Sequence, residues 1–265
     1  MNKQLRVVIL TTKLPEDIWL INKLAEVCHV EGIVLPIGKR WEEFGVINVL
    51  RKRIRQFGIL SVINQALLIL YRLFFESYKD RKSFEMIFNE KPYDHIEDNN
   101  VDILEVADIN TNEVENFIRE KSPEVVVVSG TPLLQGPILN TAKGRTVNLH
   151  PGLAPQYRGR YGAFWPLYNQ EPQLVGTTIH FIDEGIDTGA ILIQQKITIN
   201  NGDTLKTVTY KQQKVGVDLI IQCLKEFDVL AARAYNKEGC QSRNYHVPGI
   251  THYLKAKKWM RKNKF

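Results

Sequence analysis

Residues 123–130 read Pro-Glu-Val-Val-Val-Val-Ser-Gly, and this stretch decides the fold. Four consecutive β-branched residues between a proline and a glycine predict a strand that is buried on both of its faces. Parallel sheets covered by helices on both sides contain such strands, whereas strands with one solvated face alternate apolar and polar residues. The stretch therefore predicts an interior strand of an α/β protein.

The flanking sequence predicts the remaining elements of a doubly wound sheet, beginning with a strand–helix–strand unit at the N-terminus. The predicted strands are Arg6–Thr12, Val30–Leu35, Val101–Val106, Glu124–Ser129, Thr146–His150, Val175–Ile182 and Ala190–Ile199. The predicted helices run from Glu16 to Cys28, from an N-cap at Asn110 to about Lys121, and from Thr204 to about Leu230.

An insertion separates the second and third predicted strands. It starts with the basic cluster Arg51–Arg55 and continues as an apolar stretch, Phe57–Phe75, that is about as long as a membrane span. Asn64, Gln65 and Arg72 interrupt this stretch and disfavour a transmembrane helix. We expect a helical hairpin that is buried or faces a partner, with peripheral contact to an anionic membrane surface as the minor alternative.

Composition narrows the class of protein. With 265 residues, 44% hydrophobic and 24% charged, the chain has the profile of a soluble globular protein with one α/β domain and an appendage. Its three cysteines form no Cys-x-x-Cys pair and are odd in number, which predicts a reducing, cytoplasmic location without a metal site. The short apolar run Val7–Leu10 is not a secretory signal.

The net charge of +6 is concentrated in the last fifteen residues. Thr251–Phe265 contains six lysines and arginines and no acidic residue, so the rest of the chain is close to neutral. Such a tail is more typical of a solvated or loosely docked end than of a binding face. We therefore expect no stable nucleic-acid partner.

Three polar side chains are candidates for chemistry. Asn148 and His150 are two residues apart on a predicted strand, so they share a face at its C-terminal end, where open α/β sheets bind ligands. Asp187 ends an acidic loop after the next strand. An amide, an imidazole and a carboxylate can form a catalytic group. The spacing alone also allows a turn cap, a core histidine and a turn aspartate.

Three separated motifs then carry a resemblance. Asn-x-His-Pro-Gly at 148–152, Pro-x-Tyr-Arg-Gly at 155–159 and Gly-x-Thr-x-His-Phe-x-Asp-x-x-x-Asp-Thr-Gly at 176–189 occur in the order found in the folate-dependent formyltransferase superfamily. The sequence from Pro123 to Ile199 resembles this group, which includes glycinamide ribonucleotide, methionyl-tRNA and sugar N-formyltransferases. The resemblance implies a Rossmann-like, mostly parallel sheet in a catalytic domain of residues 1–200, with a helical insertion at about 41–90. Residues 201–265 would form a C-terminal helix and basic tail.

The resemblance also assigns roles to residues. It implies Asn148, His150 and Asp187 as the catalytic residues and N10-formyltetrahydrofolate as the cofactor. Residues implied to bind the cofactor are Gly130, Thr131, Pro132, Leu133, Leu134, Ile182, Asp183, Glu184 and Gly185. Residues implied to bind the substrate are Gly152, Tyr157, Arg158, Gly159, Arg160 and Lys13. The sequence departs from the family at Gly152, where many members have serine, and at Ala154, which replaces a leucine.

Formyl transfer needs a group that stabilises negative charge and a group that accepts a proton from the attacking amine. On the sequence alone, a protonated His150 and the Asn148 amide would stabilise the tetrahedral oxyanion. Asp187 would raise the pKa of His150 and accept the amine proton.

The substrate amine is less constrained by the sequence. Residues 11–15 contain no glycine for a phosphate loop, which disfavours glycinamide ribonucleotide, and few strand signals after Ile199 disfavour the C-terminal barrel of the transfer-RNA enzymes. We expect a nucleotide-linked amino sugar as the small-molecule substrate. Methionyl-tRNA, another small amine, hydrolysis of formyl-folate and a non-catalytic membrane-surface or nucleic-acid binding module stay open. A homodimer through Phe57–Phe75 or Ile191–Ile199 also stays open.

Overall fold

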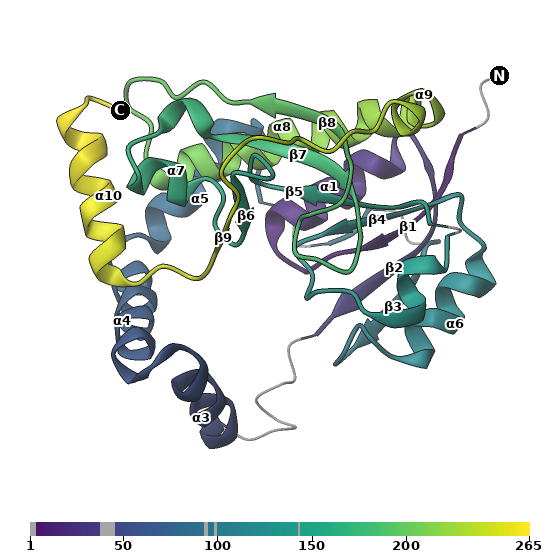
Figure 1. Ribbon diagram of the computed structural model, residues 1–265, viewed down its shortest axis with the longest axis horizontal. Helices are drawn as coiled ribbons and strands as arrows, with labels where there is room; N and C mark the ends of the chain where they lie inside the picture. The colour runs from purple at the N-terminus through teal and green to yellow at the C-terminus, as the bar shows by residue number, and fades with distance from the viewer. Residues whose placement is uncertain (1–3, 38–45, 93–94, 98–99, 143) are drawn as a thin grey trace.

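The computed structural model describes residues 4–37, 46–92, 95–97, 100–142 and 144–265. Its centre is a seven-stranded sheet in the order β3-β2-β1-β4-β5-β7-β8 (Figure 1). The strands are β1 (Arg6–Leu10), β2 (His29–Pro36), β3 (Asp102–Val106), β4 (Val125–Ser129), β5 (Thr146–His150), β7 (Gly176–Phe181) and β8 (Ile191–Lys196). The helices are α1 (Pro15–Ala25), α3 (Val46–Phe57), α4 (Ile59–Phe75), α5 (Ser77–Phe88), α6 (Asn112–Lys121), α7 (Phe164–Tyr168), α8 (Leu205–Lys225), α9 (Phe227–Ala232) and α10 (Ile250–Lys262), with 3₁₀ turns η1 (Gly136–Asn140) and η2 (Pro172–Leu174).

Both faces of the sheet are buried, as the valine run predicts. Val7 and Ile9 of β1 belong to a core with residues of α1, α5 and α8, whereas Val8 and Leu10 belong to a second core with α6 and η1. The four valines of β4 are divided between these two cores and are all buried. The predicted α/β class and the doubly wound arrangement are confirmed.

The strand pairing changes from parallel to antiparallel at β7, the neighbour of β5. Strands β3, β2, β1, β4 and β5 are parallel, but β7 pairs antiparallel with β5, and β8 antiparallel with β7. In the β5–β7 register Asn148 lies opposite His180. The C-terminal end of β5 therefore adjoins the N-terminal half of β7 rather than its C-terminal end.

Two predicted helix boundaries differ from the structure. The N-cap of α6 is Thr111, whose hydroxyl accepts from the Val114 amide, because Asn110 instead bonds the backbone at Leu133 and Gln135. The predicted helix from Thr204 to Leu230 is two helices, α8 and α9, because the chain leaves helical geometry at Glu226.

The insertion forms three helices, α3, α4 and α5, rather than a two-helix hairpin, and residues 41–45 of it lie outside the described part of the chain. Helix α5 packs against α8, while α3 and α4 extend away from the sheet (Figure 1). In the residues that the structure describes, no single helix has the length and apolarity to cross a membrane. One pair does so in combination, Leu50–Phe57 with Ile59–Phe75, and it is bent by 118°.

The C-terminal segment is docked on the body of the protein. Residues Arg243–Tyr245 form β9, which pairs in parallel with β6 (Tyr157–Gly159), and α10 packs against α7 and α4. The expectation of a loosely docked tail is wrong because Ala256 and Met260, four residues apart on α10, form a narrow buried stripe among the basic side chains.

Candidate active site

One strand end and one loop bring the three predicted catalytic residues together. Asn148 and His150 point to the same face at the end of β5, and Asp187 lies in the loop between β7 and β8. Asn148 Nδ2 donates to Asp187 Oδ1 at 3.1 Å, and His150 Nδ1 lies 3.4 Å from Asp187 Oδ2. The alternative in which each residue serves only its own local turn does not describe this geometry, because all three side chains meet at one carboxylate.

His180 is a fourth member of this cluster that sequence reasoning did not select. Its Nε2 lies 3.2 Å from Asn148 Nδ2 and 3.4 Å from Asp187 Oδ1, while its Nδ1 donates to the carbonyl of Phe181 at 2.7 Å. The signal was a histidine on a predicted strand, because a buried imidazole needs a polar partner. The partner became visible only through the antiparallel register of β5 and β7.

The orientation of Asn148 is fixed by this network. Its NH₂ group donates to Asp187 Oδ1 and lies 3.2 Å from His180 Nε2, whereas a flipped amide would place oxygen against carboxylate oxygen. The side chain of Asn148 is half-buried.

His150 is held at both ring nitrogens. Its Nε2 donates to the carbonyl of Tyr157 at 2.7 Å, and its Nδ1 faces Asp187. This approach requires Gly152, since a Cβ there would lie closer than 3.0 Å to both His150 Nε2 and the Tyr157 carbonyl oxygen. The departure from the family's serine at Gly152 therefore has a local steric reason in this chain.

The loop that carries Asp187 is shaped by its glycines. Asp187 itself has a positive φ of 50°, and a Cβ at Gly185 or Gly189 would collide with Thr188 or with the Phe181 carbonyl. Asp183 accepts from the Gly185 amide at 3.0 Å and from the Thr188 hydroxyl at 2.7 Å. The carboxylate of Asp183 is therefore used inside the loop, and it is Asp187 that reaches the cluster.

Burial and neighbouring charges have opposite effects on the pKa values of His150 and Asp187. Burial lowers the pKa of His150, and neither Asp187 nor the hydrogen bond to Tyr157, which both favour the imidazolium, reverses this. Asp187 does raise the pKa of His150, as the sequence suggested, but desolvation is the larger effect, so the expectation of a protonated His150 is wrong. Burial also opposes ionisation of Asp187, but His150, His180 and the Gly159 amide hold the pKa of its carboxyl well below the usual range.

Beside the cluster, the predicted substrate loop contains unused hydrogen-bonding groups. Arg158 donates through Nη1 to the Ile186 carbonyl at 2.9 Å, but its Nε is buried without a partner, as is Gln156 Oε1. Arg160 is exposed. The Gly159 amide donates to Asp187 Oδ2 at 2.8 Å, so this loop is tied directly to the cluster.

An aromatic stack borders the same loop. The ring of Tyr245 lies between Tyr157, at 5.1 Å and nearly parallel, and Trp165, at 5.0 Å. Asn169 donates to the hydroxyls of both tyrosines. Tyr245 comes from β9 near the C-terminus, and no local pattern in the sequence predicted that it would reach this loop.

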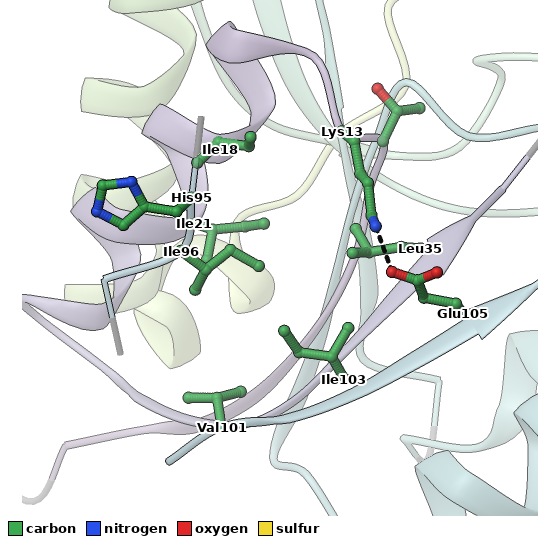
Figure 2. A pocket seen from close by; sticks show the side chains of 10 residues that line it. Lys13, Ile18, Ile21, Leu35, His95, Ile96, Val101, Ile103 and Glu105 are labelled. Carbon is green, nitrogen blue, oxygen red and sulfur yellow. Dashed lines mark hydrogen bonds and ion pairs between the residues drawn. The ribbon is translucent and has the colours of Figure 1, made fainter. Parts of the chain in front are cut away.

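Lys13 is the one predicted substrate residue that lies elsewhere. It follows β1, which is separated from β5 by β4, and pairs with Glu105 (Figure 2). The two side chains border a cavity of about 290 Å³ whose other lining residues include Ile18, Ile21 and Leu35 (Figure 2). The structure does not place Lys13 with Arg158 and Arg160.

The segment after β4 that is predicted to bind the cofactor is held in place by the side chain of Asn110. The side chain of Asn110 donates to the Leu133 carbonyl at 3.0 Å and accepts from the Gln135 amide at 2.8 Å. Among the residues that the structure describes, the amides of Thr131, Leu133 and Leu134 donate to no protein acceptor. This segment therefore offers backbone donors to a ligand beside the C-terminal end of β4, next to β5.

Comparison with known proteins shows which family model and which relatives match this sequence. The model of the formyl transferase family matches residues 79–224, more than half of the chain. A methionyl-tRNA formyltransferase from Thermodesulfovibrio yellowstonii is 40% identical over 114 residues, 42% of this chain and 37% of the relative. A GDP-perosamine N-formyltransferase from Brucella melitensis is 36% identical over 107 residues, 40% of this chain and 41% of the relative. The chain thus spans less than half the length of these two curated relatives.

Solved structures share the fold. A phosphoribosylglycinamide formyltransferase from Bacillus halodurans superposes with a TM-score of 0.54 at 22% identity, over 84% of this chain and 94% of that one. A sugar N-formyltransferase from Shewanella sp. gives 0.51 at 20% identity, over 91% and 76% of the two chains. The predicted transferase class and the predicted N10-formyltetrahydrofolate cofactor are those of this group. The matched sequence shows that the chain belongs to the formyl transferase family.

Proposed function

We propose that this protein transfers the formyl group of N10-formyltetrahydrofolate to the amino group of a nucleotide-linked amino sugar. The observation that carries the proposal is the meeting of Asn148 and His150 at the Asp187 carboxylate, at the C-terminal end of β5, in a member of the formyl transferase family. An imidazole held by an amide and a carboxylate can supply the general base that acyl transfer to an amine needs.

The residues around the cluster fit a folate. When bound, the folate supplies an activated formyl group for the attacking amine. The free amides of Thr131, Leu133 and Leu134 match the acceptors on the edge of a pterin ring, and the exposed side chain of Leu133 offers apolar surface for its face. Residues Ile182–Gly185 lie on the loop that also carries Asp187, which would bring the pterin pocket beside the cluster.

Asp187 acts as the anchor of the site. It remains ionised because four donors or imidazoles surround it, and a carboxyl with so low a pKa is a weak base. Its function is to hold Asn148, His150 and His180 in one arrangement. This differs from the role of proton acceptor that the sequence alone suggested for it.

His150 is the base of the site. It is neutral at pH 7 because burial lowers its pKa, and its Nδ1 carries a lone pair towards Asp187. It would take up at Nδ1 the proton that the amine releases, directly or through a water, and return it to the folate nitrogen that leaves as the formyl carbon bonds to the amine. The resulting imidazolium is stabilised at both nitrogens, by Asp187 and by the Tyr157 carbonyl.

Asn148 orients the reactants. It is half-buried, and its oxygen accepts a hydrogen from the incoming amine while its NH₂ group stays on Asp187. His180 fixes the Asn148 side chain from the opposite strand and is a positioning residue.

The acceptor is argued from the loop at residues 155–160. The exposed Arg160 supplies donors for a diphosphate, the neighbouring Arg158 adds positive charge, and the stack of Tyr157, Tyr245 and Trp165 supplies aromatic surface for a sugar or base. The similarity to a GDP-perosamine N-formyltransferase supports the same substrate class.

Methionyl-tRNA is the second candidate, because the relative that is 40% identical is named a methionyl-tRNA formyltransferase. The aromatic stack of Tyr157, Tyr245 and Trp165 beside the candidate active site is the observation that favours a small-molecule acceptor over it.

The test combines the purified protein, N10-formyltetrahydrofolate and a panel of nucleotide-linked 3-amino and 4-amino sugars, with methionyl-tRNA as a parallel substrate. Release of tetrahydrofolate and the mass of the product are followed. We expect one formyl group on one sugar nucleotide, lost in His150→Ala. Formylation of methionyl-tRNA alone would replace the proposed acceptor, and release of formate without any acceptor would identify a hydrolase.

A further inference from the structure

Helix α4 is oriented with its polar side towards the protein. Asn64 donates to the Thr251 hydroxyl at 2.9 Å and accepts from the Thr251 amide at 3.2 Å, both on α10. Gln65 is buried, accepts from Arg53 at 2.9 Å and donates to the Val247 carbonyl at 3.3 Å. Two of the three polar residues that interrupt the apolar stretch, Asn64 and Gln65, are thus hydrogen-bonded to α3 and the C-terminal segment.

The opposite side of α4 is apolar and exposed. Leu60 and Phe74 are 80% and 78% exposed, and they lie on one stripe at spacings of three and four residues. The exposed apolar residues of α4 are Ile59, Leu60, Ile63, Leu67, Ile69, Leu70, Leu73, Phe74 and Phe75. A soluble helix normally has the reverse arrangement, so this face is built to be covered.

The helix beside this face is basic. The sequence Val46–Phe75 contains five arginines and lysines and no acidic residue, and Arg51, Lys52 and Arg55 on α3 are exposed. In Figure 1 α3 and α4 form one end of the molecule, away from the sheet. The family match begins at residue 79, so these two helices lie outside it.

We propose that α3 and α4 form a docking surface for an anionic lipid bilayer. The apolar face of α4 enters the interfacial region in the plane of the membrane, and the basic side chains of α3 contact acidic headgroups. Because polar residues of α4 are bonded to α10, the helix lies on the bilayer and does not cross it. This surface is separate from the candidate active site on the sheet.

Charge selects a lipid surface over a second copy of the chain. A two-fold contact would place the same patch of both subunits together, and each patch has five positive charges and no acidic residue within Val46–Phe75. Anionic headgroups above an apolar layer complement both features at once. A neutral lipid surface would match only the apolar face.

The test is vesicle co-sedimentation of the full chain. Vesicles of phosphatidylcholine alone are compared with vesicles of equal parts phosphatidylcholine and phosphatidylglycerol, at low and high ionic strength. We expect binding to the anionic vesicles that weakens as salt screens the charges. Binding that is absent from both vesicles, or equal on both and independent of salt, would overturn the proposal.

Two variants separate the contributions. Leu60→Ser with Phe74→Ser removes apolar contact, and Arg51→Glu with Lys52→Glu reverses two charges; each should weaken the apparent Kd for anionic vesicles by about tenfold or more. The matched controls are Val229→Ser on α9 and Lys225→Glu with Lys237→Glu, which change exposed residues outside α3 and α4 and should bind as the parent does.

A second measurement distinguishes membrane from self-association. The fluorescence of Phe74→Trp, relative to that of the parent chain with its four tryptophans, should be quenched by brominated lipid in anionic vesicles. The free protein should keep one mass over a range of concentrations in analytical ultracentrifugation. A concentration-dependent dimer that Leu60→Ser with Phe74→Ser abolishes, without quenching by lipid, would assign the surface to a second copy instead.

Discussion

Gly152 and His150 are coupled sterically: a Cβ on Gly152 would lie closer than 3.0 Å to His150 Nε2. The same hypothetical atom would meet the Tyr157 carbonyl, which accepts from that nitrogen at 2.7 Å. The glycine therefore makes room for the hydrogen bond that sets the plane of the imidazole. The direction in which His150 presents Nδ1 depends on a residue that carries no chemistry itself.

Gly152→Ala should impair turnover more than folding. The methyl group would displace the imidazole, and a displacement of about 1 Å is worth about 100-fold in kcat/KM. Overpacking should lower the free energy of unfolding by about 1–3 kcal/mol. Steady-state kinetics and urea unfolding measure the two effects. Gly202→Ala is the control, because a Cβ there meets nothing within 4 Å; its φ of +88° predicts lost stability with unchanged kcat/KM.

His150→Ala should lower kcat by about 10²–10⁴-fold, the range expected for loss of a general base. Folate affinity, measured by titration calorimetry, should stay near that of the parent, since the free amides after β4 are untouched. The exposed His29 supplies the control variant His29→Ala. Turnover of His150→Ala close to that of the parent would show that another group accepts the proton.

His180→Leu should reduce kcat by about 10–100-fold with a smaller change in KM, because Asn148 and Asp187 lose the ring that fixes them. His180→Gln, which keeps an oxygen for the Asn148 amide, should restore part of the loss. If His180 had only a structural role, the two variants would rank in the same order by unfolding midpoint and by kcat. Kinetics beside thermal unfolding therefore decides between positioning and packing.

The acid side of the pH–rate profile should lie below pH 6.5. The pKa of His150 is lowered by burial, so the base stays neutral down to its lowered pKa, and kcat/KM falls only as the pH drops through that value. Stability follows the same sign: the unfolded chain takes up a proton at His150 below pH 6.5 before the native state does, which destabilises the fold as pH falls. A profile whose acid limb lies above pH 6.5 would contradict this.

Asp17 should give the opposite pH dependence. Burial, with a smaller contribution from Glu16, raises its pKa from 3.8 to about 7. Between these values the native state keeps a proton that the unfolded state has lost, so this residue's contribution to stability declines as pH rises. Asp17→Asn should gain about 2–3 kcal/mol over the parent between pH 5 and pH 8 in urea unfolding. Equal pH dependence in the two proteins would show that Asp17 ionises normally.

The local sequence predicted much of the sheet. The valine run of β4 and the apolar β1 specify strands buried on two faces, and these strands lie within a few residues of their predicted ranges. Boundaries were less well predicted where a side chain had two uses. Asn110 had the spacing of an N-cap but was recruited to the segment at Leu133, and Thr111 capped α6 instead.

Candidate catalytic residues could be selected from the sequence, namely Asn148, His150 and Asp187, because strand ends and motif order are local properties. The direction of the pKa shift of His150 could not, because it depends on how completely the surrounding chain excludes water. The orientation of the Asn148 amide likewise depends on His180, which the antiparallel register places opposite it.

The sequence by itself determined the α/β class, the position of Asn148 and His150 at a strand end, and the family. Only the tertiary structure decided which distant segments share the site: it brought Tyr245 against Tyr157, sent Lys13 to a separate cavity, and turned the polar side of α4 towards α10. Hydrophobic periodicity fixes which residues are buried within an element. Which elements bury one another depends on the path of the whole chain, and long-range contacts carry no signal in the local pattern.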